Sequence, residues 1–347
     1  MSRTFARYAW AVLVYNLGVV LWGAFVRATG SGAGCGNHWP LCNGAVTPGP
    51  GGAPPSAATI IEFTHRVSSG IDLALVALLV VWAFRRFPRQ HPVRLGATLS
   101  ALFLVTEALI GAALVLLEHV AKNASVSRAY SLSTHLINTL TLLACLTLTA
   151  WWSTERVGQA VPPALPRRKA VWMADISLAS VAVLGVSGAI AALGDTLFPA
   201  SSLAVGLAQD LDPASNIFLR LRLFHPLIAA AVGAWLLFYV ASSASRRPDA
   251  AGRAWSLVAL LAAQIVAGVA NLLLLAPVWM QMVHLLLADL LWITLVLLSA
   301  ATLKFQPRAA DSPSYDMGVD STRLQRHRPN HPDHPGPGAS SGPPTRG

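Results

Sequence analysis

The sequence has little charge, and this shortage narrows the class of protein. Of its 347 residues only 12% are charged, whereas soluble domains carry about 25%. Hydrophobic residues make up 54% and recur in long runs, which excludes an ordinary soluble domain and indicates an integral membrane protein. The formal net charge is +10, but no basic patch with interleaved aromatic residues is present. Nucleic acid is therefore not an expected partner, and the basic residues are expected to reflect membrane topology.

Eight hydrophobic stretches have about the length of the ~20 residues that cross a bilayer. We expect all-α spans at approximately residues 9–27, 60–84, 95–117, 131–152, 171–193, 221–242, 254–276 and 282–303. The first stretch is long enough to span and no clear cleavage site follows it, so it does not resemble a cleavable signal. The segment 305–347 is rich in Pro, His, Arg, Gly and Ser and is predicted to be a disordered cytoplasmic tail.

The connecting segments alternate in positive charge. One set, which includes the segments before the first span and after the last, contains Arg3, Arg7, Arg85, Arg86, Arg89, Arg94, Arg156, Arg167, Arg168, Lys169, Arg246, Arg247, Arg253, Lys304 and Arg308. The other set is poor in Lys and Arg, and the loop from Thr29 to Thr59 has none. The positive-inside rule therefore predicts that both termini are cytoplasmic and that loops 28–59, 118–130, 194–220 and 277–281 face outside.

Four histidines occupy matching depths, each just inside the outer end of an even-numbered span: His65, His135, His225 and His284. Titratable side chains within a bilayer are costly and are functional candidates by default. Neutral imidazole is an axial ligand of heme iron, and a bis-histidine heme needs two such residues from facing helices. A single histidine of this kind can equally be a hydrogen-bonding residue between helices. Zinc is disfavoured because it would need three or four close ligands.

The two halves of the chain resemble a tandem repeat. Trp22-Gly23-Ala24-Phe25 parallels Ser187-Gly188-Ala189-Ile190, and Glu107-Ala108-Leu109-Ile110-Gly111 parallels Gln264-Ile265-Val266-Ala267-Gly268. We therefore expect two pseudo-symmetric four-helix bundles, residues 1–160 and 161–304, each with one histidine pair on its second and fourth helices.

Charged residues beside the histidines break this symmetry. Glu62 lies three residues before His65 on the same helical face, while the matching position in the second half falls near Arg222. Glu62 is either a solvated interfacial residue or a proton acceptor and charge stabiliser beside a heme. Arg66 and Arg222 are candidates to pair with heme propionates, and interfacial snorkelling explains them equally well. Glu107, deep in the third span, is expected to be structural.

The cysteines fall into two kinds. Cys145 stands alone in an apolar run and is expected to be a small buried residue. Cys35 and Cys42 flank six residues of a loop rich in Gly and Pro. Their spacing is compatible with a local disulfide if the loop lies on the oxidising side of the membrane.

Two motifs resemble a known family. The stretch from Gly30 to Gly44, GSGAGCGNHWPLCNG, is similar to the first outer loop of bacterial heme A synthases, and Glu62-Phe63-Thr64-His65-Arg66 resembles the motif of their second helix. The resemblance extends over about residues 8–303 and leaves the tail outside. Eight spans, the tandem repeat and the three later histidines fit it as well.

The resemblance implies an oxidoreductase in a bacterial plasma membrane that converts heme O to heme A for terminal oxidases by oxidising the methyl at ring carbon 8 to a formyl group. It implies that His225 and His284 ligate a low-spin heme b, and that His65 and His135 form the site of the substrate heme O. Glu62 would be the carboxylate needed for oxidation. Cys35 and Cys42 would form a disulfide near that site.

The resemblance also suggests partners and leaves rivals open. Heme O is the expected partner, and heme O synthase, terminal oxidase assembly factors, a membrane electron carrier and a second copy of the chain are further candidates. The main rival is a non-enzymatic di-heme b-type cytochrome that relays electrons, since two histidine pairs alone fit it. A transporter is disfavoured because no helix is obviously broken at the midplane. Protoheme farnesylation is disfavoured because no aspartate-rich diphosphate motif is present.

Overall fold

The protein is described by a computed structural model that places residues 3–49, 54–154, 167–244 and 250–303. Met1–Gln306 forms one compact unit. Within the described residues the secondary structure is helical apart from one isolated β-bridge, between Cys42 and Ala45. The helices are α1 (Arg3–Ala28), η1 (Ser31–Ala33), α2 (Ala57–Arg86), α3 (Pro92–Leu116), α4 (Val126–Thr154), α5 (Arg167–Leu197), α6 (Leu203–Leu211), α7 (Ile217–Arg222), α8 (Phe224–Ala244), α9 (Ala251–Leu273) and α10 (Val278–Thr302).

Eight helical segments are long and apolar enough to cross a membrane, which confirms the predicted all-α, eight-span architecture. They are α1 to α5, the combined stretch Ile217–Ser242 that holds α7 and most of α8, and α9 and α10. Many large apolar side chains on these helices, such as Leu102, Leu109 and Val266, are exposed on the protein surface. In a bilayer such residues face lipid, so their exposure costs nothing there.

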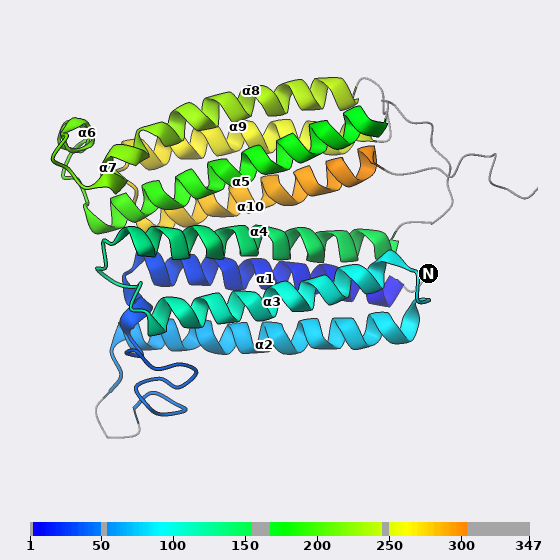
Figure 1. Cartoon of the computed structure of the whole chain (residues 1–347), viewed down its shortest axis with the longest axis horizontal. Coiled ribbons are helices and arrows are strands. Elements are labelled where there is room, and N and C mark those ends of the chain that lie inside the picture. The colour runs from blue at the N-terminus through cyan, green and yellow to red at the C-terminus, as the bar shows by residue number, and fades with distance from the viewer. Residues whose placement is uncertain (1–2, 50–53, 155–166, 245–249, 304–347) are drawn as a thin grey trace, which may run out of the picture. The chain divides into compact units, whose positions relative to one another are not determined.

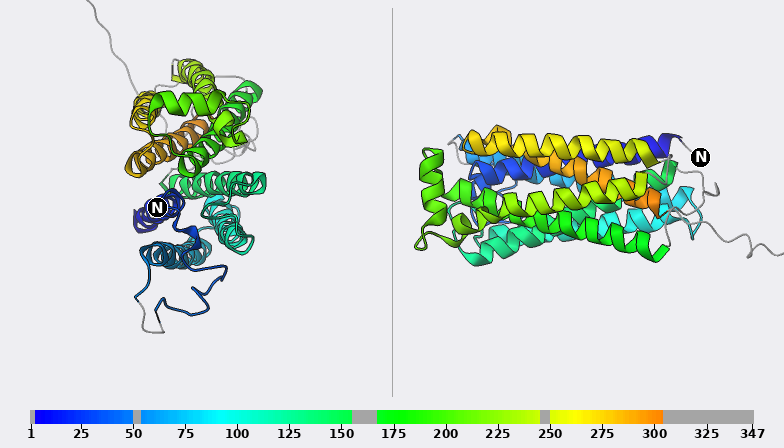
Figure 2. Two further views of the ribbon diagram at one scale, coloured as in Figure 1. Left: turned by 90° about the vertical axis from the view of Figure 1, so that its left-hand side faces the viewer. Right: turned by 90° about the horizontal axis from the view of Figure 1, so that it is seen from above.

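Figure 1 shows α1–α4 lying together on one side and α5, α8, α9 and α10 on the other. The views in Figure 2 keep this grouping. Contacts between the groups run mainly through α4 and α10, and Trp292 on α10 donates a hydrogen bond of 2.8 Å to the carbonyl of Leu140 on α4. α4 and α10 are also the most buried of the spans. The proposed division near residue 160 and the cytoplasmic side of the termini stay predictions, and the tail 305–347 falls outside the described residues.

Loop segments with the Cys35–Cys42 pair and helix α6 gather at one end of the helix group, which we call the loop end (Figure 1, left). The four histidines lie on α2, α4, α8 and α10, each near the N-terminus of its helix. These four N-termini lie at the loop end (Figure 1). Arg27 ties this end together across the two groups. Its Nη1 donates to the carbonyl of Ala192 at 3.1 Å and to the Thr196 hydroxyl at 3.3 Å, and its Nη2 donates to Gln281 at 3.1 Å.

The sixth predicted span is interrupted at Leu223, between α7 and α8. Pro226 explains the interruption, because it has no backbone N–H to donate to the carbonyl four residues earlier, that of Arg222. The short helix α6 is a further element that the hydropathy pattern did not predict. Ser202 caps it by accepting a hydrogen bond from the Val205 N–H.

Candidate functional site

Glu62 is buried between α2 and the cysteine loop, with 3% of its surface exposed. α2 begins one and a half turns earlier, where the Ser56 hydroxyl accepts a hydrogen bond from the Thr59 N–H and so fixes the start of the helix. One carboxylate oxygen accepts a hydrogen bond of 2.8 Å from the Cys35 N–H, and the other accepts one of 2.5 Å from Arg66. The alternative that Glu62 is a solvated interfacial residue is therefore wrong.

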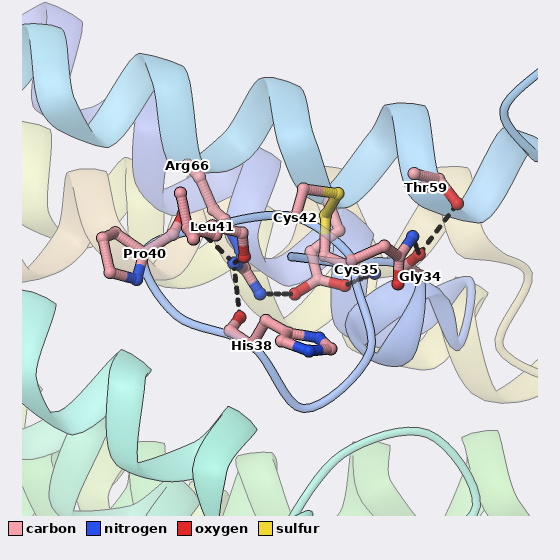
Figure 3. Close-up of polar contacts among 10 residues, drawn as sticks. Gly34, Cys35, His38, Pro40, Leu41, Cys42, Thr59 and Arg66 are labelled. Carbon is pink, nitrogen blue, oxygen red and sulfur yellow. Dashed lines mark hydrogen bonds and ion pairs between the residues drawn. A yellow bond between two sulfur atoms is a disulfide. The ribbon is translucent and has the colours of Figure 1, made fainter. Parts of the chain in front are cut away.

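The cysteine loop is closed and pressed against the first turns of α2 (Figure 3). Cys35 and Cys42 form a disulfide, as predicted, and both residues are buried. The Thr59 hydroxyl donates to the carbonyl of Gly34 at 2.8 Å. A side chain at Gly34 would collide with the α2 backbone at Ala58, so only glycine allows the loop this close. The loop backbone thereby brings the Cys35 N–H to Glu62.

Arg66 holds the other side of the same loop (Figure 3). Besides its ion pair with Glu62, its Nη1 donates to the carbonyls of His38 at 2.8 Å and Leu41 at 2.7 Å. These contacts lie within the protein and differ from the two roles considered for Arg66, propionate pairing and snorkelling, which stay predictions. Its guanidinium connects the loop to α2 through planar, multiple hydrogen bonds, a geometry that lysine could not reproduce.

His65 on α2 and His135 on α4 lie close enough that a charge on one would oppose a charge on the other. Glu107 on α3 is adjacent to His135, with 3.5 Å between its Oε1 and the imidazole Nδ1. The same carboxylate accepts hydrogen bonds from Asn138, at 2.5 Å, and from Thr139, both on α4. Glu107 is thus hydrogen-bonded within the bundle, which agrees with the structural role expected of it. The sequence does not predict that Glu107 lies close to His135, although the repeated segment places Glu107 four residues before Gly111.

The second half pairs its histidines in the same way but with neutral neighbours. His225 on α8 and His284 on α10 likewise lie close enough that a charge on one would oppose a charge on the other. The hydroxyl of Ser187 on α5 lies 2.9 Å from Nδ1 of His225, and the amide of Gln264 on α9 lies 3.2 Å from Nε2 of His284. Gln264 occupies the repeat position of Glu107, so a carboxylate beside a histidine in the first half corresponds to an uncharged amide in the second.

Arg222 pairs with two carboxylates near the start of the helix that carries His225. Its Nε donates to Asp210 at 2.5 Å and its Nη1 to Asp195 at 2.8 Å, while Nη2 donates to the carbonyl of Gly206 on α6 at 3.1 Å. Burial raises the pKa of the Asp210 carboxyl, and the Arg222 guanidinium opposes that rise. As with Arg66, these contacts differ from propionate pairing and snorkelling, which stay predictions, and Arg222 connects α6 and α5 to α7.

The donor set fits heme iron better than a metal held by a protein cluster. Nδ1 of His65, His135 and His284 is buried and has no hydrogen-bond partner within the described segments. A buried nitrogen without a partner is costly, so each of these three rings has one nitrogen that a ligand such as iron could satisfy. Across residues 3–49, 54–154, 167–244 and 250–303, no three His, Cys, Asp or Glu side chains come together to hold a metal ion. Pairs of imidazoles are the ligand set of a six-coordinate heme.

Two further histidines at the loop end, His119 and His38, have no hydrogen bond to the four paired histidines within the described residues. Nδ1 of His119 lies 2.8 Å from the hydroxyl of Ser131, one helical turn before His135. His38 lies in the cysteine loop, where its carbonyl accepts from Arg66. Cys145 is buried in α4, as expected from its apolar neighbourhood.

Comparisons with known proteins identify the family of the chain. The profile of the family described as cytochrome oxidase assembly protein, COX15-CtaA, matches residues 6–296. A Thermus thermophilus protein named protoheme IX farnesyltransferase is 47% identical over 302 residues, which cover 86% of this chain and 48% of that protein.

Heme A synthases are similar over shorter stretches. That of Halalkalibacterium halodurans is 34% identical over 44% of this chain and 46% of its own length, and that of Geobacillus kaustophilus is 40% identical over 33% and 35%. The chain spans about half the length of the first curated relatives it matches. Because the family profile covers nearly all of the eight-helix region, the chain belongs to the COX15-CtaA family of cytochrome oxidase assembly proteins.

Proposed function

We propose that the protein is a heme A synthase that oxidises the methyl group at ring carbon 8 of heme O to a formyl group. The observation that carries the proposal is Glu62, which is buried, fixed by two hydrogen bonds and located one turn before a paired histidine in the first half only. An electron-relaying cytochrome has no evident need for such a carboxylate. A reaction that removes hydrogen from a methyl group does need a group that accepts a proton.

In this proposal the first half binds the substrate. His65 and His135 would ligate the iron of heme O, and Glu62 would take up a proton at one carboxylate oxygen or stabilise positive charge that develops on the substrate. Arg66 and the disulfide loop act by holding Glu62 in place and by covering it from water. Glu107 would orient the imidazole of His135, as carboxylates beside metal-ligating histidines do.

The second half would bind heme b between His225 and His284. When bound, this heme supplies one-electron transfer to or from the first half. Ser187 and Gln264 would orient the two rings by hydrogen bonds to their nitrogens. The neutral neighbours of this pair suit a permanent electron-transfer cofactor, whereas the carboxylates of the first half suit a site where protons are exchanged.

Farnesyl transfer, the activity named for the Thermus relative, is not proposed for this chain. More than half of that protein lies outside the matched region, so its named activity can reside there. The sequence of this chain offers no aspartate-rich motif to bind a prenyl diphosphate. We place the protein after such a transferase, because heme O is a farnesylated heme. Heme O synthase and terminal oxidase assembly factors are the proposed partners in the bacterial plasma membrane.

Pigment chromatography of cells that make heme O and express the protein tests the proposal. We expect heme A and hydroxymethyl heme with the wild type, and neither with Glu62→Gln, while the purified variant retains heme b. A wild type that binds two hemes but yields no oxidised heme would support the di-heme cytochrome instead. An unchanged yield from Glu62→Gln would remove Glu62 from the reaction.

A further inference from the structure

Each of the four histidines lies against a glycine of another helix. Gly23 on α1 faces His65, Gly111 on α3 faces His135, Gly188 on α5 faces His225, and Gly268 on α9 faces His284. In both halves, the glycine lies on the membrane span that comes immediately before the span with the histidine. The repeated Trp-Gly-Ala and Ser-Gly-Ala segments and the two later glycines of the sequence repeat are these contact points.

The clearance is too small for a side chain at Gly23 and Gly188 and is tight at Gly268. A methyl group on Gly23 would lie 2.9 Å from Cε1 and 3.1 Å from Nε2 of His65. On Gly188 it would lie 2.9 Å from Cε1 of His225, and on Gly268 it would lie 3.1 Å from Cε1 of His284. Carbon atoms pack at about 3.5–4.0 Å, so the rings of His65 and His225 would have to move, and that of His284 would have to shift by a few tenths of an ångström.

The fourth position differs. A methyl group on Gly111 would lie 4.0 Å from Cε1 of His135, an ordinary contact distance. The ring of His135 therefore has space toward α3 that the other three rings lack. It is also the ring whose contact with a carboxylate, Glu107, is a loose one of 3.5 Å.

Close helix packing by small residues is the alternative explanation for glycines in membrane helices. Two other glycines, one on α1 and one on α2, argue against helix packing as the general reason here. Gly18 on α1 and Gly70 on α2 have no other part of the protein within 4 Å of where a methyl group would be. Among the glycines of α1 and α2, only Gly23 is thus in close contact, and its neighbour is the histidine, whereas Gly96 on α3 and Gly194 on α5 are close to other residues.

We propose that Gly23, Gly188 and Gly268 are positioning residues, which fix three of the imidazole rings in the orientation for heme ligation, and that the wider clearance at Gly111 leaves His135 as the one ligand able to adjust. This rests on the proposed function only in that the histidines ligate heme. A fixed pair in the second half suits a resident cofactor. One fixed and one adjustable ligand in the first half suit a substrate that enters and leaves.

Alanine variants of the four glycines test the proposal, with heme binding as the readout rather than product. Each full-length variant is purified in detergent, its heme content per polypeptide is measured, and the heme-depleted protein is titrated with ferric protoheme. We expect Gly188→Ala and Gly268→Ala to weaken protoheme binding at least about tenfold and to change the low-spin electron paramagnetic resonance signal. Gly23→Ala should leave this second-half signal unchanged and weaken binding of heme O.

Three comparison variants separate positioning from packing. Gly111→Ala should have the smallest effect of the four, and Gly18→Ala should have none on either heme. Gly96→Ala introduces a collision with Thr149 at the opposite end of α3 and α4, away from any of the four histidines. It should lower the unfolding temperature without changing the heme signal. Unchanged affinity and signal in Gly188→Ala and Gly268→Ala, or equal losses in Gly18→Ala, would overturn the proposal.

A variant that fails to accumulate is tested through its partner ring. If the methyl group of Gly188→Ala collides with His225, removing the ring in a Gly188→Ala, His225→Ala double variant should restore accumulation to the level of His225→Ala alone. If it does not, the glycine serves helix packing and the proposal is wrong. These outcomes do not depend on product. If the wild type forms no heme A, the proposed function is wrong, but the proposed positioning role of the glycines is unaffected.

Discussion

Replacing Arg66 by methionine should release the cysteine loop. The arginine side chain is only 13% exposed and donates to Glu62 and to the carbonyls of His38 and Leu41. Methionine preserves much of the side-chain volume but leaves a buried carboxylate without its ion partner, a defect that costs about 3–5 kcal/mol. The loss falls on the contact between the loop and α2, because no other recorded partner of Glu62 is charged.

Glu62→Gln should be milder than Arg66→Met. The glutamine oxygen can still accept from the Cys35 N–H, and Arg66 still reaches the loop carbonyls, so this variant should lose about 1–2 kcal/mol. In the Arg66→Met, Glu62→Gln double variant the unpaired charge is gone. Its destabilisation should therefore be at least ~1 kcal/mol smaller than the sum of the two single effects, as expected for residues in one network.

Native-state proteolysis of the loop measures these effects. When opening is fast relative to cleavage, the cleavage rate follows the free energy of opening, and about 3 kcal/mol corresponds to at least ~100-fold faster cutting within residues 31–47. Arg94→Met is the matched control, because its guanidinium stacks on Phe84 at 4.0 Å, at the opposite end of α2. Unchanged cleavage in Arg66→Met, or strictly additive effects in the double variant, would refute the ion-pair role assigned to Arg66.

Two further changes test the supporting groups of the first half. Glu107→Gln should lower the affinity of the first-half site for heme O about 10–100-fold, since it weakens a contact that orients an iron ligand; titration of heme-depleted protein measures it, and equal affinity with the wild type would contradict it. Cys42→Ser removes a cross-link between residues seven positions apart, worth about 2–3 kcal/mol of loop order. Loop cleavage should accelerate and product should fall while the second-half heme signal persists, and loss of that signal as well would show that the disulfide serves the whole fold.

Much of the fold follows from local features of the sequence. Spans of about 20 apolar residues mark membrane helices because lipid cannot satisfy backbone groups, and all eight predicted spans are present. The disulfide followed from two cysteines in one short loop. Hydropathy does not predict the interruption between α7 and α8, although Pro226 marks it. A hydropathy profile averages over a window and does not register a single missing N–H.

The candidate site divides differently between sequence and structure. The four histidines, Glu62 and the cysteine pair could be singled out from the sequence, because such residues are unusual in an apolar chain and match a family motif. Their contacts could not: Arg66 binds the loop, Glu107 lies beside His135, and a glycine faces every histidine ring. Each of these contacts joins residues on different helices or loops, at distances of a few ångströms that packing sets and that no local sequence pattern encodes.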